Sequence, residues 1–94
     1  MFHRIIEIKP LSDLRLQAQF QGGEQKIYDV APLQERWPVF RSLTEIPGLF
    51  ELVRVDIGGY GVVWNDEIDL AAEEIWVNGV PANDEIKSKI TMQK

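Results

Sequence analysis

The 94-residue chain has the length and composition of one small globular domain, and its formal net charge is −5. It contains no cysteine, which excludes disulfides, zinc–thiolate sites, iron–sulfur clusters and a cysteine nucleophile. No apolar stretch approaches the ~20 residues of a membrane span, and Glu7 and Lys9 interrupt any signal-peptide core. We therefore expect a cytoplasmic protein that contacts no membrane and holds no cofactor.

The first half of the chain begins with β-type patterns. A strand is predicted over residues 2–8, and Pro10 is expected to end it. The clearest pattern follows over residues 14–20, where apolar and polar side chains alternate, as in a strand with one buried face. The glycines within residues 21–24 predict a tight turn, so residues 26–30 are expected to return as the partner strand.

Prolines then mark two short helices. Pro32 can occupy the first turn of a helix over residues 33–37, which ends because residue 37 precedes a proline. Pro38 can begin the second helix, over residues 38–43. A Pro-Gly turn at 47–48 separates the two halves of the domain.

The second half repeats the hairpin pattern. Residues 49–57 predict a strand, the glycine pair at 58–59 a turn, and residues 60–64 the returning strand. Asp69 is a suitable N-cap for a short helix over residues 70–76.

The predicted order β-β-β-α-β-β-α indicates an α+β fold. We expect a small antiparallel sheet of two β-hairpins with short helices packed on one face. Residues 1–81 are expected to form the single domain, and residues 82–94 a polar tail that is partly ordered at most.

Several short motifs, from about Ile5 to Trp76, resemble the bacterial family catalogued as domain of unknown function 2442. The motif residues are Asp13, Leu16, Ala18 and Phe20; Tyr28, Asp29 and Val30; Pro32 and Leu33; Phe40 and Leu43; Phe50, Val53, Val55 and Asp56; Gly61, Val62, Val63 and Trp64; Asp66, Glu67, Ile68, Asp69 and Leu70; and Glu74, Ile75 and Trp76. The most specific motif is the tryptophan followed closely by acid-acid-Ile-Asp-Leu. Trp76 stands where the family usually has tyrosine, which preserves an aromatic side chain there.

The resemblance implies a small bacterial α+β domain without assigned catalytic residues. Some similar proteins carry a helix-turn-helix domain, and others look like partners of a neighbouring small protein in toxin–antitoxin-like pairs. The present sequence shows no recognition-helix pattern, and its Lys and Arg residues are scattered. We therefore expect no direct nucleic-acid binding by this chain alone.

The negative charge is concentrated in the second half of the chain. Residues 1–47 contain six acids and six bases, whereas residues 55–86 contain eight acids and neither Lys nor Arg. This acidic half is interpreted either as a solvated surface or as a surface that attracts a basic partner.

Few residues suggest catalysis or metal binding. His3 is the only histidine, and no nucleophile pattern accompanies it. The acidic loop over residues 65–73 offers oxygen ligands, but Leu70 occupies the place where a calcium loop of the EF-hand type needs glycine. A small metal-dependent hydrolase built on this loop is kept as an alternative hypothesis.

The leading hypothesis is a non-enzymatic interaction module that binds another protein, for example a basic one. Binding would use the acidic half and a nearby aromatic patch, or an exposed strand edge. The predicted contact residues are Trp37, Tyr60, Trp64, Asp66, Glu67 and Asp69. An antitoxin-like or transcription-regulatory accessory subunit is a further alternative. A homodimer through an open sheet edge is also compatible with the sequence.

Overall fold

The computed structural model describes residues 2–82, which form two antiparallel sheets and three short α-helices. The larger sheet has the strand order β1 (Ile5–Leu11), β2 (Arg15–Phe20), β3 (Gln25–Asp29), β7 (Val80–Pro81). The smaller sheet has the order β4 (Arg54–Val55), β5 (Gly61–Val63), β6 (Asp69–Ala71). The α-helices are α1 (Leu33–Arg36), α2 (Ser42–Glu45) and α3 (Ala72–Asn78). The 3-10 turns include η2 (Pro38–Arg41), η3 (Phe50–Leu52) and η4 (Ile57–Gly59). The predicted α+β class is confirmed.

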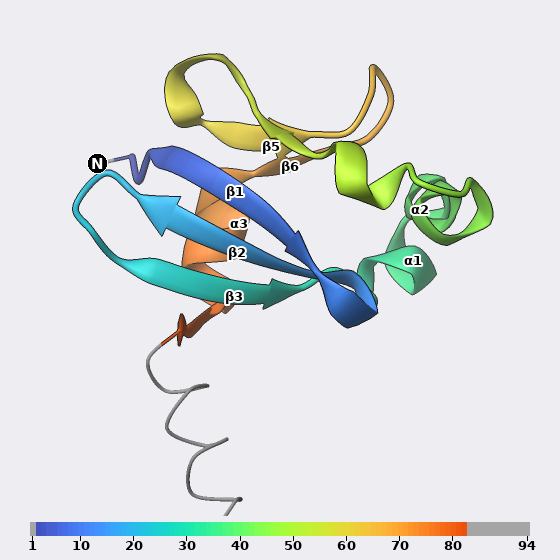
Figure 1. Ribbon diagram of the computed structural model, residues 1–94, viewed down its shortest axis with the longest axis horizontal. Helices are drawn as coiled ribbons and strands as arrows, with labels where there is room; N and C mark the ends of the chain where they lie inside the picture. Colours follow the sequence, from blue (N-terminus) through green and yellow to red (C-terminus); the bar gives the residue numbers. More distant parts are fainter. Residues whose placement is uncertain (1, 83–94) are drawn as a thin grey trace, which may run out of the picture.

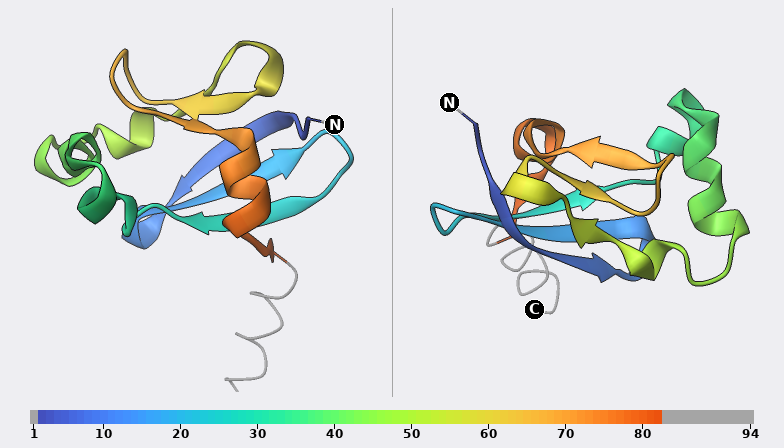
Figure 2. Two further views of the ribbon diagram at one scale, coloured as in Figure 1. Left: turned by 180° about the vertical axis from the view of Figure 1, so that it is seen from behind. Right: turned by 90° about the horizontal axis from the view of Figure 1, so that it is seen from above.

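The elements are arranged around the inner face of the larger sheet. Helix α3 crosses behind β1, β2 and β3, and the smaller sheet lies along the β1 side of the larger one (Figure 1). Helices α1 and α2 lie together at one end of the molecule, away from α3 (Figure 2). The expectation of one sheet with all helices on one face is therefore corrected, because each predicted hairpin belongs to its own sheet.

The first hairpin is confirmed. Leu16, Ala18 and Phe20 of β2 are buried, and the polar residues between them are half-buried on the opposite face. Strand β1 continues through Pro10 to Leu11, so the prediction that Pro10 ends the strand is wrong. β1 is the outermost strand of its sheet, and a proline without an N–H is tolerated on an edge strand.

The second half differs more from the prediction. The expected strand over 49–57 is reduced to Arg54–Val55, because Phe50–Leu52 forms a 3-10 turn. The helix expected at residue 70 begins at Ala72, because Asp69–Ala71 pairs with β5 as a strand. Asp69 is therefore a strand residue and not a helix cap. Tertiary pairing overrides the local helix signal here.

The two sheets and α3 share one hydrophobic core. Its buried members come from both sheets, from α3 and from the helical segment, and include Leu16, Phe20, Leu33, Phe40, Val62, Trp64, Ile68 and Ile75. The predicted tail over 82–94 lies outside the described residues except for Ala82, which is buried.

Gly59 lets η4 approach β1 closely. Its φ is 78°, and a Cβ atom placed there would lie 2.6 Å from the carbonyl oxygen of Ile5. Side-chain-bearing residues are disfavoured at this φ, and the close backbone leaves no space for one. The approach holds the turn of the second hairpin against the first strand of the other sheet.

Substitution of Gly59 tests this packing. Gly23 also has a positive φ, of 99°, but a Cβ atom at that position would meet nothing within 4 Å, so Gly23→Ala is a matched control for backbone strain alone. We expect Gly23→Ala to lower the free energy of unfolding by about 1–2 kcal/mol. Gly59→Ala adds a backbone clash and should lower the free energy of unfolding by roughly twice as much. Equal losses in urea denaturation would contradict the close approach.

Candidate interaction site

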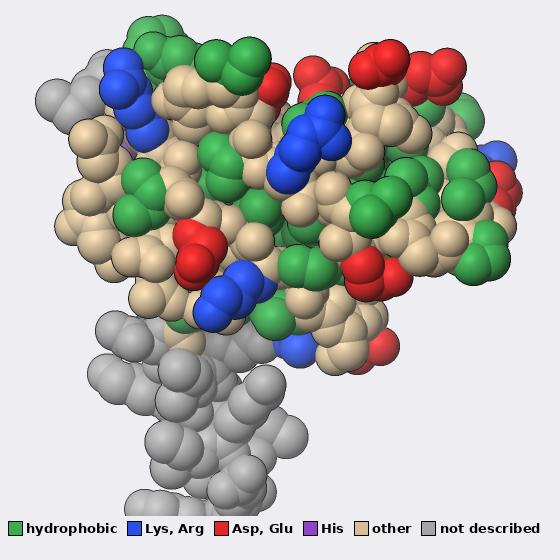
Figure 3. Space-filling model, turned by 45° about the horizontal axis from the view of Figure 1, so that its top comes forward, with side chains coloured by type: hydrophobic (Ala, Val, Ile, Leu, Met, Phe, Trp, Pro, Cys, Tyr) green, Lys and Arg blue, Asp and Glu red, His purple; other side chains and the backbone are tan. Residues whose placement is uncertain are grey.

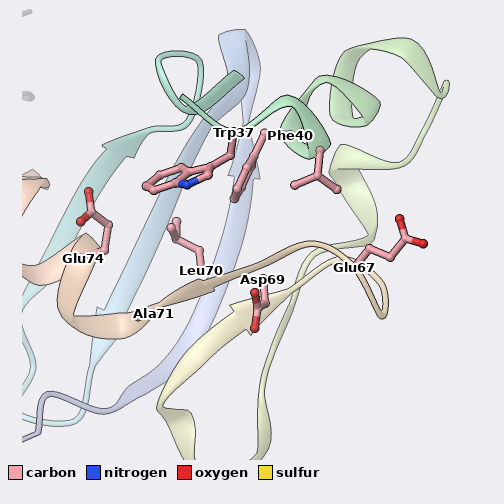
Figure 4. Close-up of a pocket in the computed structure, with 8 residues that line it drawn as sticks. Trp37, Phe40, Glu67, Asp69, Leu70, Ala71 and Glu74 are labelled. Atoms are coloured by element: carbon pink, nitrogen blue, oxygen red, sulfur yellow. The ribbon is translucent and has the colours of Figure 1, made fainter. Parts of the chain in front are cut away.

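An open hollow separates the residues that follow α1 from strand β6. Its volume is about 380 Å³. Trp37, Val39 and Phe40 line one side, and the other side is lined by Glu67, Asp69, Leu70, Ala71 and Glu74 (Figure 4). We call this hollow the aromatic groove. It combines apolar walls with three carboxylates.

Trp37 forms the exposed part of the aromatic wall. Its backbone is extended and its N–H donates a hydrogen bond to the Leu33 carbonyl at 2.9 Å, which closes α1. The side chain is 46% exposed, and the Arg36 guanidinium lies 4.5 Å from its ring centroid. The buried Phe40 ring lies 6.3 Å from the Trp37 ring. A large aromatic surface is thus presented to solvent on a short, proline-bounded segment.

Trp64 lies beneath this wall and is not part of the surface. Only 2% of the residue is exposed, and its indole N–H donates a hydrogen bond to the Phe50 carbonyl at 3.1 Å. Its ring contacts Phe40 edge-on at a centroid distance of 6.1 Å. The prediction that Trp64 contacts a partner is therefore wrong. A buried tryptophan whose N–H is satisfied is a packing residue, and this one supports Phe40 from below.

The acidic rim follows from the turn between β5 and β6. The Asn65 side-chain oxygen accepts hydrogen bonds from the backbone N–H groups of Glu67 and Ile68, at 2.9 and 3.0 Å. Ile68 is buried and anchors the turn, so Asp66 and Glu67 are left exposed. Acidic side chains gather over this turn in the space-filling view (Figure 3). Within residues 2–82, the carboxylates of Asp66, Glu67 and Asp69 form no ion pair.

Glu74 of α3 contributes the third carboxylate of the groove. Its Oε2 atom accepts hydrogen bonds from the Tyr28 hydroxyl at 2.8 Å and from the Asn78 side-chain amide at 2.9 Å. Burial, followed by the hydrogen bond to Glu74, raises the pKa of the Tyr28 hydroxyl well above its usual value. The hydrogen bond from Tyr28 fixes the Glu74 carboxylate in place.

The structure brings together three of the predicted contact residues. Trp37, Glu67 and Asp69 all line the groove, whereas Asp66 is exposed in the turn outside it. Tyr60 is half exposed on a different hollow, where its hydroxyl accepts a hydrogen bond from Arg4 at 3.1 Å.

Sequence reasoning missed Phe40, Leu70 and Glu74 as groove residues. The three-residue spacing of Trp37 and Phe40 could have indicated a shared face in a helical segment. No comparable local signal identifies Leu70 or Glu74, because their places depend on the pairing of β6 with β5.

His3 has a structural role at the N-terminal end of the described chain. Its ring stacks on Trp76 of α3 with a centroid distance of 3.8 Å and an interplanar angle of 10°. Glu73 accepts the backbone N–H of His3 at 2.7 Å, and a ring nitrogen of His3 lies 3.0 Å from the same carboxylate oxygen. These bonds, the backbone bond foremost, lower the pKa of Glu73. The N-terminal segment is thus fixed to α3.

The lowered pKa of Glu73 predicts a pH-dependent stability. A carboxyl whose pKa is lower in the folded than in the unfolded state stabilises the fold above its unfolded pKa. This stabilisation is lost as the pH falls through the folded value. The excess of the wild-type unfolding midpoint over that of Glu73→Gln should therefore be present at about pH 5 and should shrink as the pH falls below about 4. Urea denaturation from about pH 3 to 7 measures this difference in unfolding midpoint. A constant difference over that range would contradict the lowered pKa of Glu73.

The structure offers little to a metal centre. Among the described residues, no three His, Asp or Glu side chains lie close enough to share a metal ion. The carboxylates of the 65–73 loop form no such group.

No helix within residues 2–82 has the length and apolar character needed to cross a bilayer.

The fold and the groove together define a small α+β domain with an acidic, aromatic surface hollow. The chain belongs to the family described as protein of unknown function (DUF2442), whose family model matches residues 5–81. The suggested resemblance is thus confirmed. Searches of curated proteins and of solved structures found no match.

Proposed function

We propose that this chain is a non-enzymatic protein–protein interaction module and that the aromatic groove is its binding site. The observation that carries the proposal is the exposed Trp37 ring, which faces Leu70 beside Phe40 in a hollow rimmed by carboxylates (Figure 4). The partner inserts an apolar side chain between these walls and brings positive charge to the rim.

Two physical arguments support this use of the groove. Tryptophan is enriched among the residues that dominate binding energy, because its large surface is removed from water on contact. Glu67 and Asp69 have no ion-pair partner within the described residues, so a cationic partner meets them without displacing an existing contact. The acidic half of the chain also steers a basic partner toward this side.

An antitoxin-like or regulatory accessory subunit would be a special case of the same module. Its partner would then be a toxin or a DNA-binding protein that occupies the groove. The identity of the bound protein separates this case from other interaction modules.

Variants of the groove test the proposal. A partner is captured from extract of the native host, identified, purified and titrated against the full chain. Trp37→Ala and the double variant Glu67→Lys, Asp69→Lys should each weaken binding by about tenfold or more, because they remove apolar contact or reverse the rim charge.

Tyr60→Ala and Glu45→Lys are matched controls, since these exposed residues lie outside the groove. Both should bind as wild type does. Unchanged binding by the groove variants, or an equal loss in the controls, would contradict the proposal.

A further inference from the structure

Strand β6 forms one wall of the aromatic groove and is the last strand of the smaller sheet. Within residues 2–82, in the order β4-β5-β6, it pairs only with β5, in the register Gly61↔Ala71, Val62↔Leu70 and Val63↔Asp69. Its other edge faces Trp37 and Phe40 across the groove (Figure 4). The groove is therefore bounded by a free strand edge as well as by side chains.

The hydrogen bonds around β6 show which backbone groups that edge presents. Trp64 donates its N–H to the Ile68 carbonyl at 3.0 Å, and Ala72 donates its N–H to the Tyr60 carbonyl at 2.9 Å. Residues of an antiparallel strand alternate between bonding to the partner and pointing away from it. The even-numbered residues of β6 thus face β5, and the backbone groups of Asp69 and the N–H of Ala71 point toward the free edge.

No hydrogen bond within residues 2–82 occupies these outward groups. Backbone groups on an open edge are a ready template for another strand. The aromatic wall opposite offers contact area to the side chains of that strand.

We propose that the partner binds as an extended segment that adds a fourth strand to the smaller sheet, antiparallel to β6, with an apolar residue next to a basic one. This inference rests on the proposed function and specifies the form and chemistry of its partner. It belongs to the recognition mode in which backbone bonds give affinity and alternate side chains give specificity.

The register follows from the free groups. One partner residue opposite Asp69 exchanges two hydrogen bonds with its backbone, and the residue two positions earlier accepts one from the Ala71 N–H. The intervening residue lies opposite Leu70 and shares its face, toward Trp37 and Phe40.

The side-chain preferences follow from that register. The residue opposite Leu70 is apolar, because its neighbours are Leu70 and the aromatic wall. The residue opposite Asp69 is Lys or Arg, because side chains directly opposite each other in a sheet interact and Asp69 has no ion pair among the described residues.

Ala71→Pro isolates the backbone contribution. Ala71 has φ −69° and an exposed side chain, and its N–H points away from β5. Proline has the same φ preference, so the substitution removes one edge donor without disturbing the existing ladder. Ala71→Ser keeps the N–H and is the matched control. Circular dichroism and the thermal unfolding midpoint establish that both variants fold.

The probe is the acetylated and amidated peptide Val-Lys-Val-Lys-Val-Lys, titrated into the full chain by calorimetry. In the proposed register the lysine N–H groups face β6 and the valine N–H groups face away. Methylation of the backbone amide nitrogens of the lysine residues should therefore abolish binding. Methylation of the backbone amide nitrogens of the valine residues should leave binding largely intact. Ala71→Pro should weaken binding by about two- to tenfold or more, the range of one backbone hydrogen bond, and Ala71→Ser should not.

The outcomes separate strand addition from groove binding. Strand addition is wrong, and the groove remains a binding site, if Trp37→Ala abolishes peptide binding while two other measurements are unchanged. These are the affinity of Ala71→Pro for the peptide and the affinity of wild type for both methylated peptides. If wild type does not bind the peptide, the proposed partner chemistry is wrong, and the host-partner titration decides the proposed function by itself. If binding protects the Asp69 and Ala71 amides from hydrogen exchange, strand addition is supported directly.

Discussion

The buried indole of Trp64 is the contact on which the rest of the site depends. It follows β5 directly, and its N–H bond to the Phe50 carbonyl joins the smaller sheet to η3. Its ring also packs against Phe40 and Phe50, at centroid distances of 6.1 and 6.2 Å. The Trp64 side chain therefore connects the end of β5 to both η2 and η3. Through Phe40, this packing supports the aromatic wall that stands opposite β6.

The opposite wall of the groove is fixed by contacts to α3. Lys26 donates a hydrogen bond to the Trp76 carbonyl at 2.6 Å and lies 4.4 Å from the centroid of its ring. His3 stacks on the same ring, and Phe20 meets it edge-on. Since α3 begins at the residue after β6, these contacts also set the position of the β6 edge. A site held from both sides in this way loses little conformational entropy when a partner binds.

The sequence predicted the parts of the fold that depend on local patterns. Strict alternation from Leu16 to Phe20 and the glycine turn after it were sufficient for the first hairpin. β6 was missed because its three residues look like the start of a helix, and only pairing with β5 makes them a strand. The same limit applies to the site. Exposure of Trp37 and burial of Trp64 are set by tertiary packing, so composition and spacing could not separate the two tryptophans.

Hydrogen exchange of the tryptophan indole N–H groups in the free protein tests the central claim most directly. If Trp64 joins the segments around the groove, its indole N–H should exchange only on unfolding, with a protection free energy close to that of global unfolding. Trp37 is half exposed, so its indole N–H should exchange with little protection. Equally fast exchange at Trp64 and Trp37 would show that the buried bond to Phe50 does not hold the groove together, and the account would fail.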